Sequence, residues 1–302
     1  MNIACCILCP RACRVNRTAG ETGFCGMDDT LRVARAALHF WEEPCLSGTR
    51  GSGAVFFSGC SLRCVYCQND QISGGESGLP ISTQRLCEIF FELKAQGAHN
   101  INLITPTHFV PQIRAALQES RRNGLGIPVI YNTGGYELPK TLQLLDGLVD
   151  IYLPDFKYAS SALAARYSQA ADYPECAKQA IAEMVRQTGS AVLDEDGIMQ
   201  RGTIVRHLLL PGQLSDSKAV IQALFETYGN RIWYSLMNQY TPVSRPDLPP
   251  ELRRPVSQEE YDELVDYAAD LGIENGFIQE GGTAEESFIP PFDNTGVLAP
   301  GR

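Results

Sequence analysis

After about residue 50 the chain alternates short apolar runs with longer segments in which apolar residues recur every three or four positions. Short apolar runs bounded by turn residues indicate buried strands, whereas the longer periodic segments indicate amphipathic helices. The strands are predicted at residues 54–57, 101–105, 128–133, 149–153, 204–210, 231–237 and 276–279, and the helices at residues 82–97, 111–123, 141–145, 174–188, 217–225 and 258–271.

This regular order predicts an α/β fold. Strands that alternate with helices form a parallel sheet joined by right-handed crossovers. About six strand–helix repeats are too few for a closed eight-stranded barrel, so we expect an open, partial (β/α)6 barrel. In such folds the loops after the carboxyl ends of the strands carry the functional site.

A second region precedes the predicted barrel. Residues 1–48 hold a dense set of cysteines, together with a short strand from Leu31 that leads into the main domain. We therefore interpret residues 1–48 as a small cysteine-rich, metal-binding N-terminal extension, and residues 49–302 as the partial barrel with a C-terminal extension.

Composition and charge narrow the class of protein. The 302 residues carry a net charge of −10, which argues against a broad phosphate-binding face, so no nucleic-acid partner is expected. The first residues lack the basic and apolar regions of a signal peptide, and no apolar run is as long as a membrane-spanning helix, so no membrane partner is expected. The 11 cysteines cluster instead of spreading as a disulfide framework does, which predicts a reducing, cytoplasmic location.

Three cysteines follow the first predicted barrel strand. Cys60, Cys64 and Cys67 fall within eight residues, so strain prevents all three from pairing with one another. Their thiolates suit a soft metal centre, either an iron–sulfur cluster or zinc. In a cube of four irons, three ligands leave one iron open for a small molecule, and an open position is typical of a catalytic centre. The alternative is a structural zinc knuckle.

A second cysteine set lies near the N-terminus. Cys6, Cys9, Cys13 and Cys25 can supply four thiolates, and Cys5 is an alternative to Cys6. Four ligands leave no open position, which is typical of a closed structural site holding zinc or an auxiliary iron–sulfur cluster. The spacing does not decide between these two, and ordinary reduced cysteines are the third interpretation.

The spacing Cys-x3-Cys-x2-Cys, with Tyr66 before the last cysteine, resembles the signature of the radical S-adenosylmethionine (SAM) superfamily. Further motifs resemble one branch, the proteins similar to pyruvate formate-lyase activating enzyme, which activate glycyl radical enzymes or are related to such activases. These motifs are Cys-x2-Cys-Pro-x2-Cys, Cys-Val-Tyr-Cys-Gln-Asn, Thr-Pro-Thr-His, Tyr-Asn-Thr-x-Gly-Tyr-Glu, Pro-Asp-Phe-Lys-Tyr, Arg-His-Leu-x-Leu-Pro-Gly and Leu-Met-x-Gln-Tyr. The resemblance covers nearly the whole chain and implies a radical SAM partial barrel.

The resemblance implies an oxidoreductase that uses a [4Fe-4S] cluster on the three cysteines. A flavodoxin- or ferredoxin-type partner supplies one electron, SAM is cleaved reductively, and the 5′-deoxyadenosyl radical abstracts a hydrogen atom from the substrate. The substrate is either a glycine of a partner glycyl radical enzyme, another peptide or a small metabolite, because kinship of fold does not fix a substrate. A non-catalytic iron–sulfur electron carrier is the alternative from a different class. About 200 residues of strand–helix units after the cysteines argue against it.

The resemblance also implies which residues surround SAM. Tyr66 matches the aromatic residue near the adenine, and Gln239 matches a position that reaches the ribose. Activases bind the SAM ammonium with a Gly-Gly-Glu motif after the second strand. Here Thr105 and Thr107 stand at that place and can offer oxygen atoms to the ammonium instead.

Four more positions of this chain match polar residues that follow later strands in the family. Asn132 and Asp155 match the positions that hold SAM or a monovalent cation, although the relatives carry an aspartate where this chain has Asn132. Lys157 and Arg206 match cations beside the SAM carboxylate, where a guanidinium can make a bidentate contact.

Overall fold

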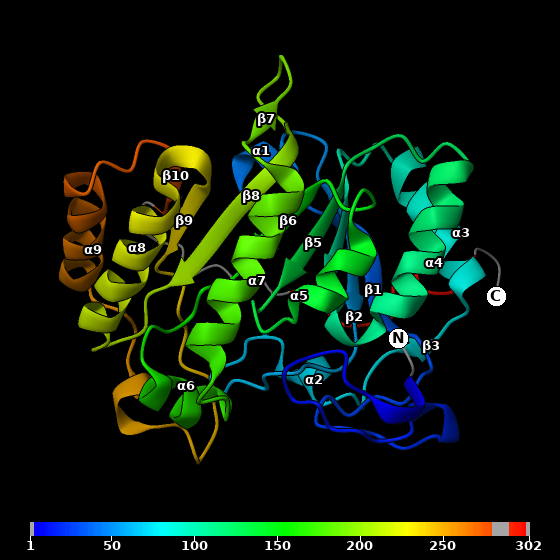
Figure 1. The fold of residues 1–302 in the computed structure, drawn as a ribbon, viewed down its shortest axis with the longest axis horizontal. Coiled ribbons are helices and arrows are strands. Elements are labelled where there is room, and N and C mark those ends of the chain that lie inside the picture. Colours follow the sequence, from blue (N-terminus) through cyan, green and yellow to red (C-terminus); the bar gives the residue numbers. More distant parts are fainter. Residues whose placement is uncertain (1–2, 280–289, 300–302) are drawn as a thin grey trace.

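The computed structural model describes residues 3–279 and 290–299 of the chain. The described residues form a curved ten-stranded sheet in the order β10-β9-β8-β6-β5-β4-β2-β1-β3, with β7 paired to β8 (Figure 1). The strands are β1 (Arg32–His39), β2 (Ser52–Phe57), β3 (Leu79–Pro80), β4 (Ile101–Ile104), β5 (Val129–Thr133), β6 (Ile151–Pro154), β7 (Val192–Leu193), β8 (Met199–Leu208), β9 (Trp233–Met237) and β10 (Gly276–Ile278).

Neighbouring strands run parallel from β2 to β10, whereas β1 pairs antiparallel with β2 and with β3. Every residue of β2, β4, β5 and β6 is buried, as expected for strands covered on both faces. The predicted fold class, an α/β partial barrel, is therefore confirmed.

Helices follow the strands and cover the outer face of the sheet (Figure 1). Their starts follow local capping chemistry: the Ser82 side chain accepts a hydrogen bond from the Arg85 amide, and Ser257 forms a capping box with Glu260. The α-helices are α1 (Pro44–Ser47), α2 (Asp70–Ser73), α3 (Thr83–Ala95), α4 (Val110–Arg122), α5 (Pro139–Leu142), α6 (Ser161–Ser168), α7 (Tyr173–Thr188), α8 (Leu214–Tyr228) and α9 (Gln258–Asp270). The 3-10 helices are η1 (Ile3–Cys5), η2 (Arg17–Ala19), η3 (Thr107–Phe109), η4 (Gln143–Leu145), η5 (Gly229–Arg231) and η6 (Pro250–Arg253).

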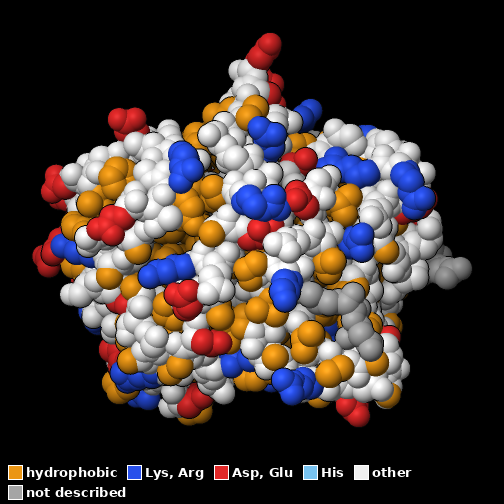
Figure 2. Space-filling model, viewed as in Figure 1, with side chains coloured by type: hydrophobic (Ala, Val, Ile, Leu, Met, Phe, Trp, Pro, Cys, Tyr) orange, Lys and Arg blue, Asp and Glu red, His pale blue; other side chains and the backbone are white. Residues whose placement is uncertain are grey.

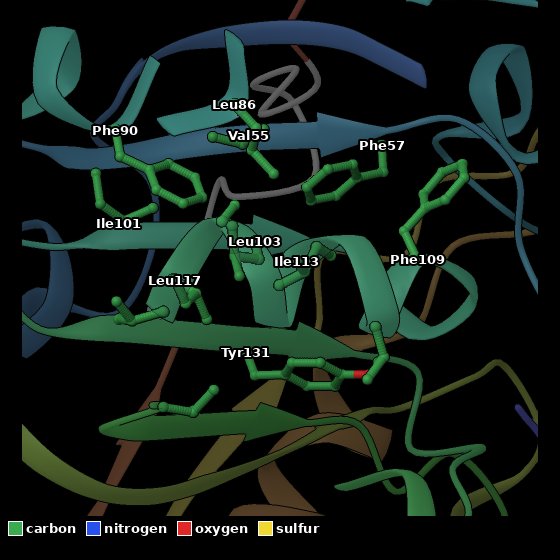
Figure 3. Close-up of a cluster of buried hydrophobic side chains, with 14 of the residues drawn as sticks. Val55, Phe57, Leu86, Phe90, Ile101, Leu103, Phe109, Ile113, Leu117 and Tyr131 are labelled. Atoms are coloured by element: carbon green, nitrogen blue, oxygen red, sulfur yellow. The ribbon is translucent and has the colours of Figure 1, made fainter. Parts of the chain in front are cut away.

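The largest core lies between the first parallel strands and their helices (Figure 3). Helices α3 and α4 contribute Leu86, Phe90, Ile113 and Leu117, which are fully buried or nearly so. Burial of one such side chain contributes about 1.5–3 kcal/mol relative to exposure. The strand residues that they cover include Val55, Phe57, Ile101, Leu103 and Tyr131.

A smaller apolar cluster fills the inside of the barrel near the amino ends of the strands. Cys45 and Leu46 of α1 pack there with Ile130, Ile151 and Ile204, which come from three parallel strands. Helix α1 lies at the opposite end of the strands from α2, which follows the cysteine-bearing loop (Figure 1). The interior is thus filled at one end and free for a site at the other.

Some element boundaries differ from the predicted ones. Helix α6 was not predicted, because its eight residues, Ser-Ala-Leu-Ala-Ala-Arg-Tyr-Ser, are short and carry a weak apolar period. Strand β8 begins at Met199 rather than at residue 204, because its first residues pair with β7 outside the parallel sheet. Helix α8 extends beyond the predicted residues 217–225 at both ends.

The two ends of the described chain flank the barrel. Residues before β1 lie beside the loop that follows β2, while Asn294 and Thr295 exchange backbone hydrogen bonds with β1. The proposed division of the chain at residue 48 stays a prediction. Among the described residues, no helix has the length and apolar character needed to cross a membrane. On the face drawn in Figure 2, acidic and basic side chains are interspersed.

Candidate functional site

A cavity of about 360 Å³ opens at the carboxyl ends of the parallel strands. Cys60, Cys64 and Cys67 form one part of its wall, directly after β2. The remaining wall comes from the ends of β4, β5, β6, β8, β9 and β10 and from the segment before α1. The edge of the sheet that was predicted to carry the site therefore does line a cavity.

The cysteine loop is held in one shape by tight backbone contacts. Gly59 has a φ of +88°, and a Cβ atom there would lie 2.6 Å from the Met27 side chain and 2.7 Å from the Cys25 carbonyl oxygen. Only glycine fits such a turn without a shift of its neighbours. Beyond it, the Leu62 amide donates to the Cys60 sulfur at 3.4 Å. The loop thus presents its thiols with a fixed backbone around them.

Burial makes these thiols poor acids until a metal replaces the proton. Burial, together with the neighbouring thiols of Cys60 and Cys64, raises the pKa of Cys67 to about 12. Burial and Cys64 likewise raise the pKa of Cys60. Lys157 opposes both effects and so favours thiolates at this place. Metal binding would therefore release protons, as is usual for thiolate ligands.

The chemistry of the three thiols fits an iron–sulfur cluster. Within residues 3–279 and 290–299, no group of three or more His, Cys, Asp or Glu side chains is drawn together closely enough to hold one metal ion. Each cysteine of a four-iron cube binds a different iron, so its ligands stand further apart than those of a zinc ion. The donor set is three soft thiols that line an open cavity, which is the ligand chemistry that a [4Fe-4S] cluster would need.

Seven of the eight other residues predicted around SAM line the same cavity. Thr107 is the exception and corrects the prediction. Helix η3 starts directly after Pro106 and turns Thr107 away, so that its hydroxyl donates to Glu137 at 2.5 Å and its side chain is buried. The residues that do line the cavity are Tyr66, Thr105, Asn132, Asp155, Lys157, Arg206 and Gln239.

Asp155 and Lys157 form an ion pair inside the cavity. Lys157 Nζ lies 2.6 Å from Asp155 Oδ2, and the two side chains are only 17% and 24% exposed. Burial alone would lower the pKa of Lys157, but the Asp155 carboxylate, together with Cys64 and Tyr173, outweighs it, and the pKa is raised. Lys157 is therefore a cation at neutral pH, next to the thiols, as a group facing an anionic ligand needs to be.

Arg206 meets two carboxylates that the sequence did not point to. Its Nε and Nη2 donate to Glu43 at 2.7 and 2.6 Å, and Nη2 also donates to Glu42. All three side chains are at most 15% exposed. Glu42 and Glu43 lie more than 160 residues before Arg206, and as polar residues next to Pro44 they gave no local signal of a site. Arg206 has only Nη1 without a protein acceptor among the described residues.

The N-terminal cysteines gather beside the cysteine loop. Burial raises the pKa of Cys9 to about 12, with further contributions from Cys25 and Cys13, and burial together with Cys6 and Cys13 raises that of Cys25. Cys9, Cys13 and Cys25 therefore lie within electrostatic reach of one another, and Cys6 lies within reach of Cys25. Both Cys5 and Cys13 are exposed. The same segment contacts the loop after β2 through the Cys25 carbonyl described above.

Comparison with known proteins shows that this chain is similar to a family model, to a protein of related sequence and to a solved structure. Residues 47–154 match the family model for a 4Fe-4S single cluster domain. An uncharacterized protein of Methanocaldococcus jannaschii is 26% identical over 279 residues, which is 89% of this chain and 75% of that protein. The structure of Streptococcus suis SuiB bound to S-adenosylmethionine superposes with a TM-score of 0.51 and 13% identity, over 74% of this chain and 49% of SuiB.

The structure of SuiB bound to its precursor peptide SuiA gives a similar match, with a TM-score of 0.50 and 13% identity over 74% of this chain and 46% of SuiB. The chain thus spans about half the length of SuiB. At this identity the likeness establishes the fold. The chain has a partial-barrel fold similar to that of SuiB, and its match to the 4Fe-4S single cluster domain includes Cys60, Cys64 and Cys67.

Proposed function

We propose that this chain is a radical SAM enzyme in which Cys60, Cys64 and Cys67 hold a [4Fe-4S] cluster. The observation that carries the proposal is the convergence of three thiols, a buried lysine and a buried arginine on one cavity at the carboxyl end of a parallel sheet. When bound, the cluster supplies one electron that splits SAM into methionine and a 5′-deoxyadenosyl radical, which takes a hydrogen atom from the substrate.

The chain's own residues would bind and orient SAM. The Lys157 ammonium, and Arg206 through its one free nitrogen, are suited to the SAM carboxylate. The Thr105 and Asn132 side chains can offer oxygen atoms to the SAM ammonium. Tyr66 supplies an aromatic wall for the adenine, and Gln239 is suited to the ribose. Asp155, which pairs with Lys157, would supply the carboxylate that binds a monovalent cation.

For the substrate we favour a glycine in a partner protein, as the likeness to pyruvate formate-lyase activating enzymes suggests. SuiB has been crystallised with a precursor peptide, so another peptide is the second substrate class to test, and a small metabolite is the third. A flavodoxin- or ferredoxin-type protein in the cytoplasm would supply the electron. These finer assignments rest on sequence resemblance.

We further propose that Cys6, Cys9, Cys13 and Cys25 bind zinc or a second iron–sulfur cluster. Electrostatic influence among these thiols supports the proposal, although the described side chains are not drawn together closely enough to hold one ion. Metal analysis of a variant lacking Cys60, Cys64 and Cys67 tests this. Residual iron and sulfide indicate a second cluster, residual zinc indicates a structural ion, and no bound metal contradicts the proposal.

The main proposal is tested by anaerobic reconstitution and incubation with dithionite and SAM. The wild-type protein should release 5′-deoxyadenosine, whereas Cys64→Ala should release none. Cys87→Ala is the matched control, because Cys87 is also buried but lies on the core-facing side of α3. If the reduced wild-type cluster leaves SAM intact, the electron-carrier alternative holds. Deuterium transfer into 5′-deoxyadenosine from labelled peptides or metabolites then identifies the substrate class.

A further inference from the structure

We propose that Ser168 is a positioning residue that sets the reduction potential of the cluster through a hydrogen bond to the Cys64 sulfur. The inference rests on the proposed function and assigns a role to α6, the helix that the sequence did not predict. Ser168 is the last residue of α6, and its hydroxyl lies 3.0 Å from Cys64 Sγ. Neither residue was linked to the other by any motif, because 104 positions separate them.

The hydrogen bond is the last in a buried chain of hydroxyl groups. The Tyr158 hydroxyl lies 2.8 Å from the Ser168 hydroxyl, and the Tyr66 hydroxyl lies 2.7 Å from that of Tyr158. All four residues are buried, with Cys64 the most exposed at 7%. Water therefore does not compete for these groups.

Counting protons fixes the direction of the chain. A thiolate only accepts hydrogen bonds, so the single proton of the Ser168 hydroxyl points to Cys64. Tyr158 must then donate to Ser168, and Tyr66 must donate to Tyr158. Three hydroxyl dipoles are thereby aligned toward one sulfur, and aligned hydrogen bonds polarise and strengthen one another.

The contact is held in place by the backbone on both sides. The Val65 amide donates to the Tyr167 carbonyl at 2.8 Å, which ties the cysteine loop to α6. Arg11 of the N-terminal segment donates to the carbonyls of Ser61 and Ser168, each at 2.8 Å. The Ser168 hydroxyl therefore cannot drift from the sulfur without breaking several other bonds.

A donor at a ligand sulfur favours the state with more negative charge. Reduction adds one electron to the cluster, so a hydrogen bond to the Cys64 sulfur stabilises the reduced form and raises the potential. Both redox states receive this hydrogen bond, so removing it changes the potential only by the difference between its strength in the reduced and in the oxidised state. We expect Ser168→Ala to lower the equilibrium constant for one-electron reduction about tenfold, which is a potential about 59 mV lower.

The test is a redox titration of the reconstituted full-length protein, followed by electron paramagnetic resonance of the reduced cluster. Ser168→Ala should shift the midpoint down, and Tyr158→Phe should shift it in the same direction by less, because it removes only the second hydroxyl. Ser61→Ala is the matched control: Ser61 is buried beside Cys60 but contributes its backbone carbonyl to Arg11. Its midpoint should equal that of the wild type.

The outcomes separate this inference from the proposed function. A wild-type protein that takes up no cluster overturns both. A wild-type protein that binds the cluster and cleaves SAM, while Ser168→Ala and Tyr158→Phe keep the wild-type midpoint, overturns the role of Ser168 alone. Equal shifts in Ser168→Ala and Ser61→Ala also overturn it, because they show a general loosening of the loop. If Ser168→Ala fails to hold a cluster, the Tyr158→Phe variant tests the inference instead: a lowered midpoint supports it, and an unchanged midpoint overturns it.

Discussion

A buried carboxyl group beside the site makes the stability of this protein depend on pH in a calculable way. Glu137 is fully buried, and its Oε1 accepts hydrogen bonds from Thr107 and Thr133 at 2.5 and 2.6 Å, while Oε2 has no hydrogen-bond partner within the described part of the chain. Burial raises its pKa from 4.5 to about 7, against the lowering effect of the Thr107, Thr133 and Tyr131 hydroxyls. Since these bonds join the ends of β4 and β5, Glu137 braces the edge of the cavity.

The sign of the effect follows from proton binding. Between pH 4.5 and about 7 the folded protein holds a proton on Glu137 that the unfolded chain has lost, so stability falls as the pH rises. At about 1.4 kcal/mol for each pH unit, the loss is about 3 kcal/mol across this window. Below pH 4.5 both states are protonated, and the contribution is constant.

The Glu137→Gln variant isolates this contribution, because glutamine keeps the shape of the side chain and does not titrate. Urea unfolding followed by circular dichroism at several values between pH 5 and 8 gives the free energy of unfolding of both proteins. We expect the variant to gain about 3 kcal/mol relative to the wild type between pH 5 and pH 8. A constant difference across this range would refute the reasoning, since it would show that Glu137 keeps an ordinary pKa when folded.

Three further changes test the site. Arg206→Met leaves two buried carboxylates without a cation, so unfolding in urea should show a loss of about 3–5 kcal/mol, and a loss below 1 kcal/mol would contradict the buried network. Gly59→Ala should lower the melting temperature and the iron content more than Gly97→Ala. Both glycines have a positive φ, but only at Gly59 would an added Cβ atom meet close neighbours. Equal effects of the two substitutions would exclude a steric clash at Gly59. Lys157→Met should weaken SAM binding to the reconstituted protein about tenfold by equilibrium dialysis, and unchanged affinity would remove Lys157 from the site.

Local patterns made most of the fold predictable. Strands β2, β4, β5 and β6 are buried along their whole length, so each gives a short apolar run in the sequence. The spacing of Cys60, Cys64 and Cys67 is also a local feature. Helix α6 was not predicted because eight residues are too few for the spacing of apolar positions to distinguish a helix from a loop.

The parts of the site that depend on distant contacts were not predictable. Glu42 and Glu43 meet Arg206 only because α1 closes the barrel end and brings the preceding turn inside. Ser168 meets Cys64 only because α6 folds back on the cysteine loop. In both cases the residue types are common and the spacing is arbitrary, so no single-sequence signal exists. Thr107 shows that closeness in sequence can also mislead. It lies two positions after the cavity residue Thr105, but its side chain points into the core.

The charges of the cavity alternate along its length, which explains how so many can be buried together. Lys157 lies next to the thiols and pairs with Asp155; Asp155 in turn raises the pKa of Arg206, which binds Glu43. An isolated charge at any of these places would cost several kcal/mol in desolvation, whereas each charge here has a neighbour of opposite sign. The lysine at the end of the series has thiols as its further neighbours, and their charge is completed only when they lose their protons. Loading of the proposed cluster and stability of this charged interior should therefore be coupled, because the cationic lysine lies at the end of the cavity where the thiols stand.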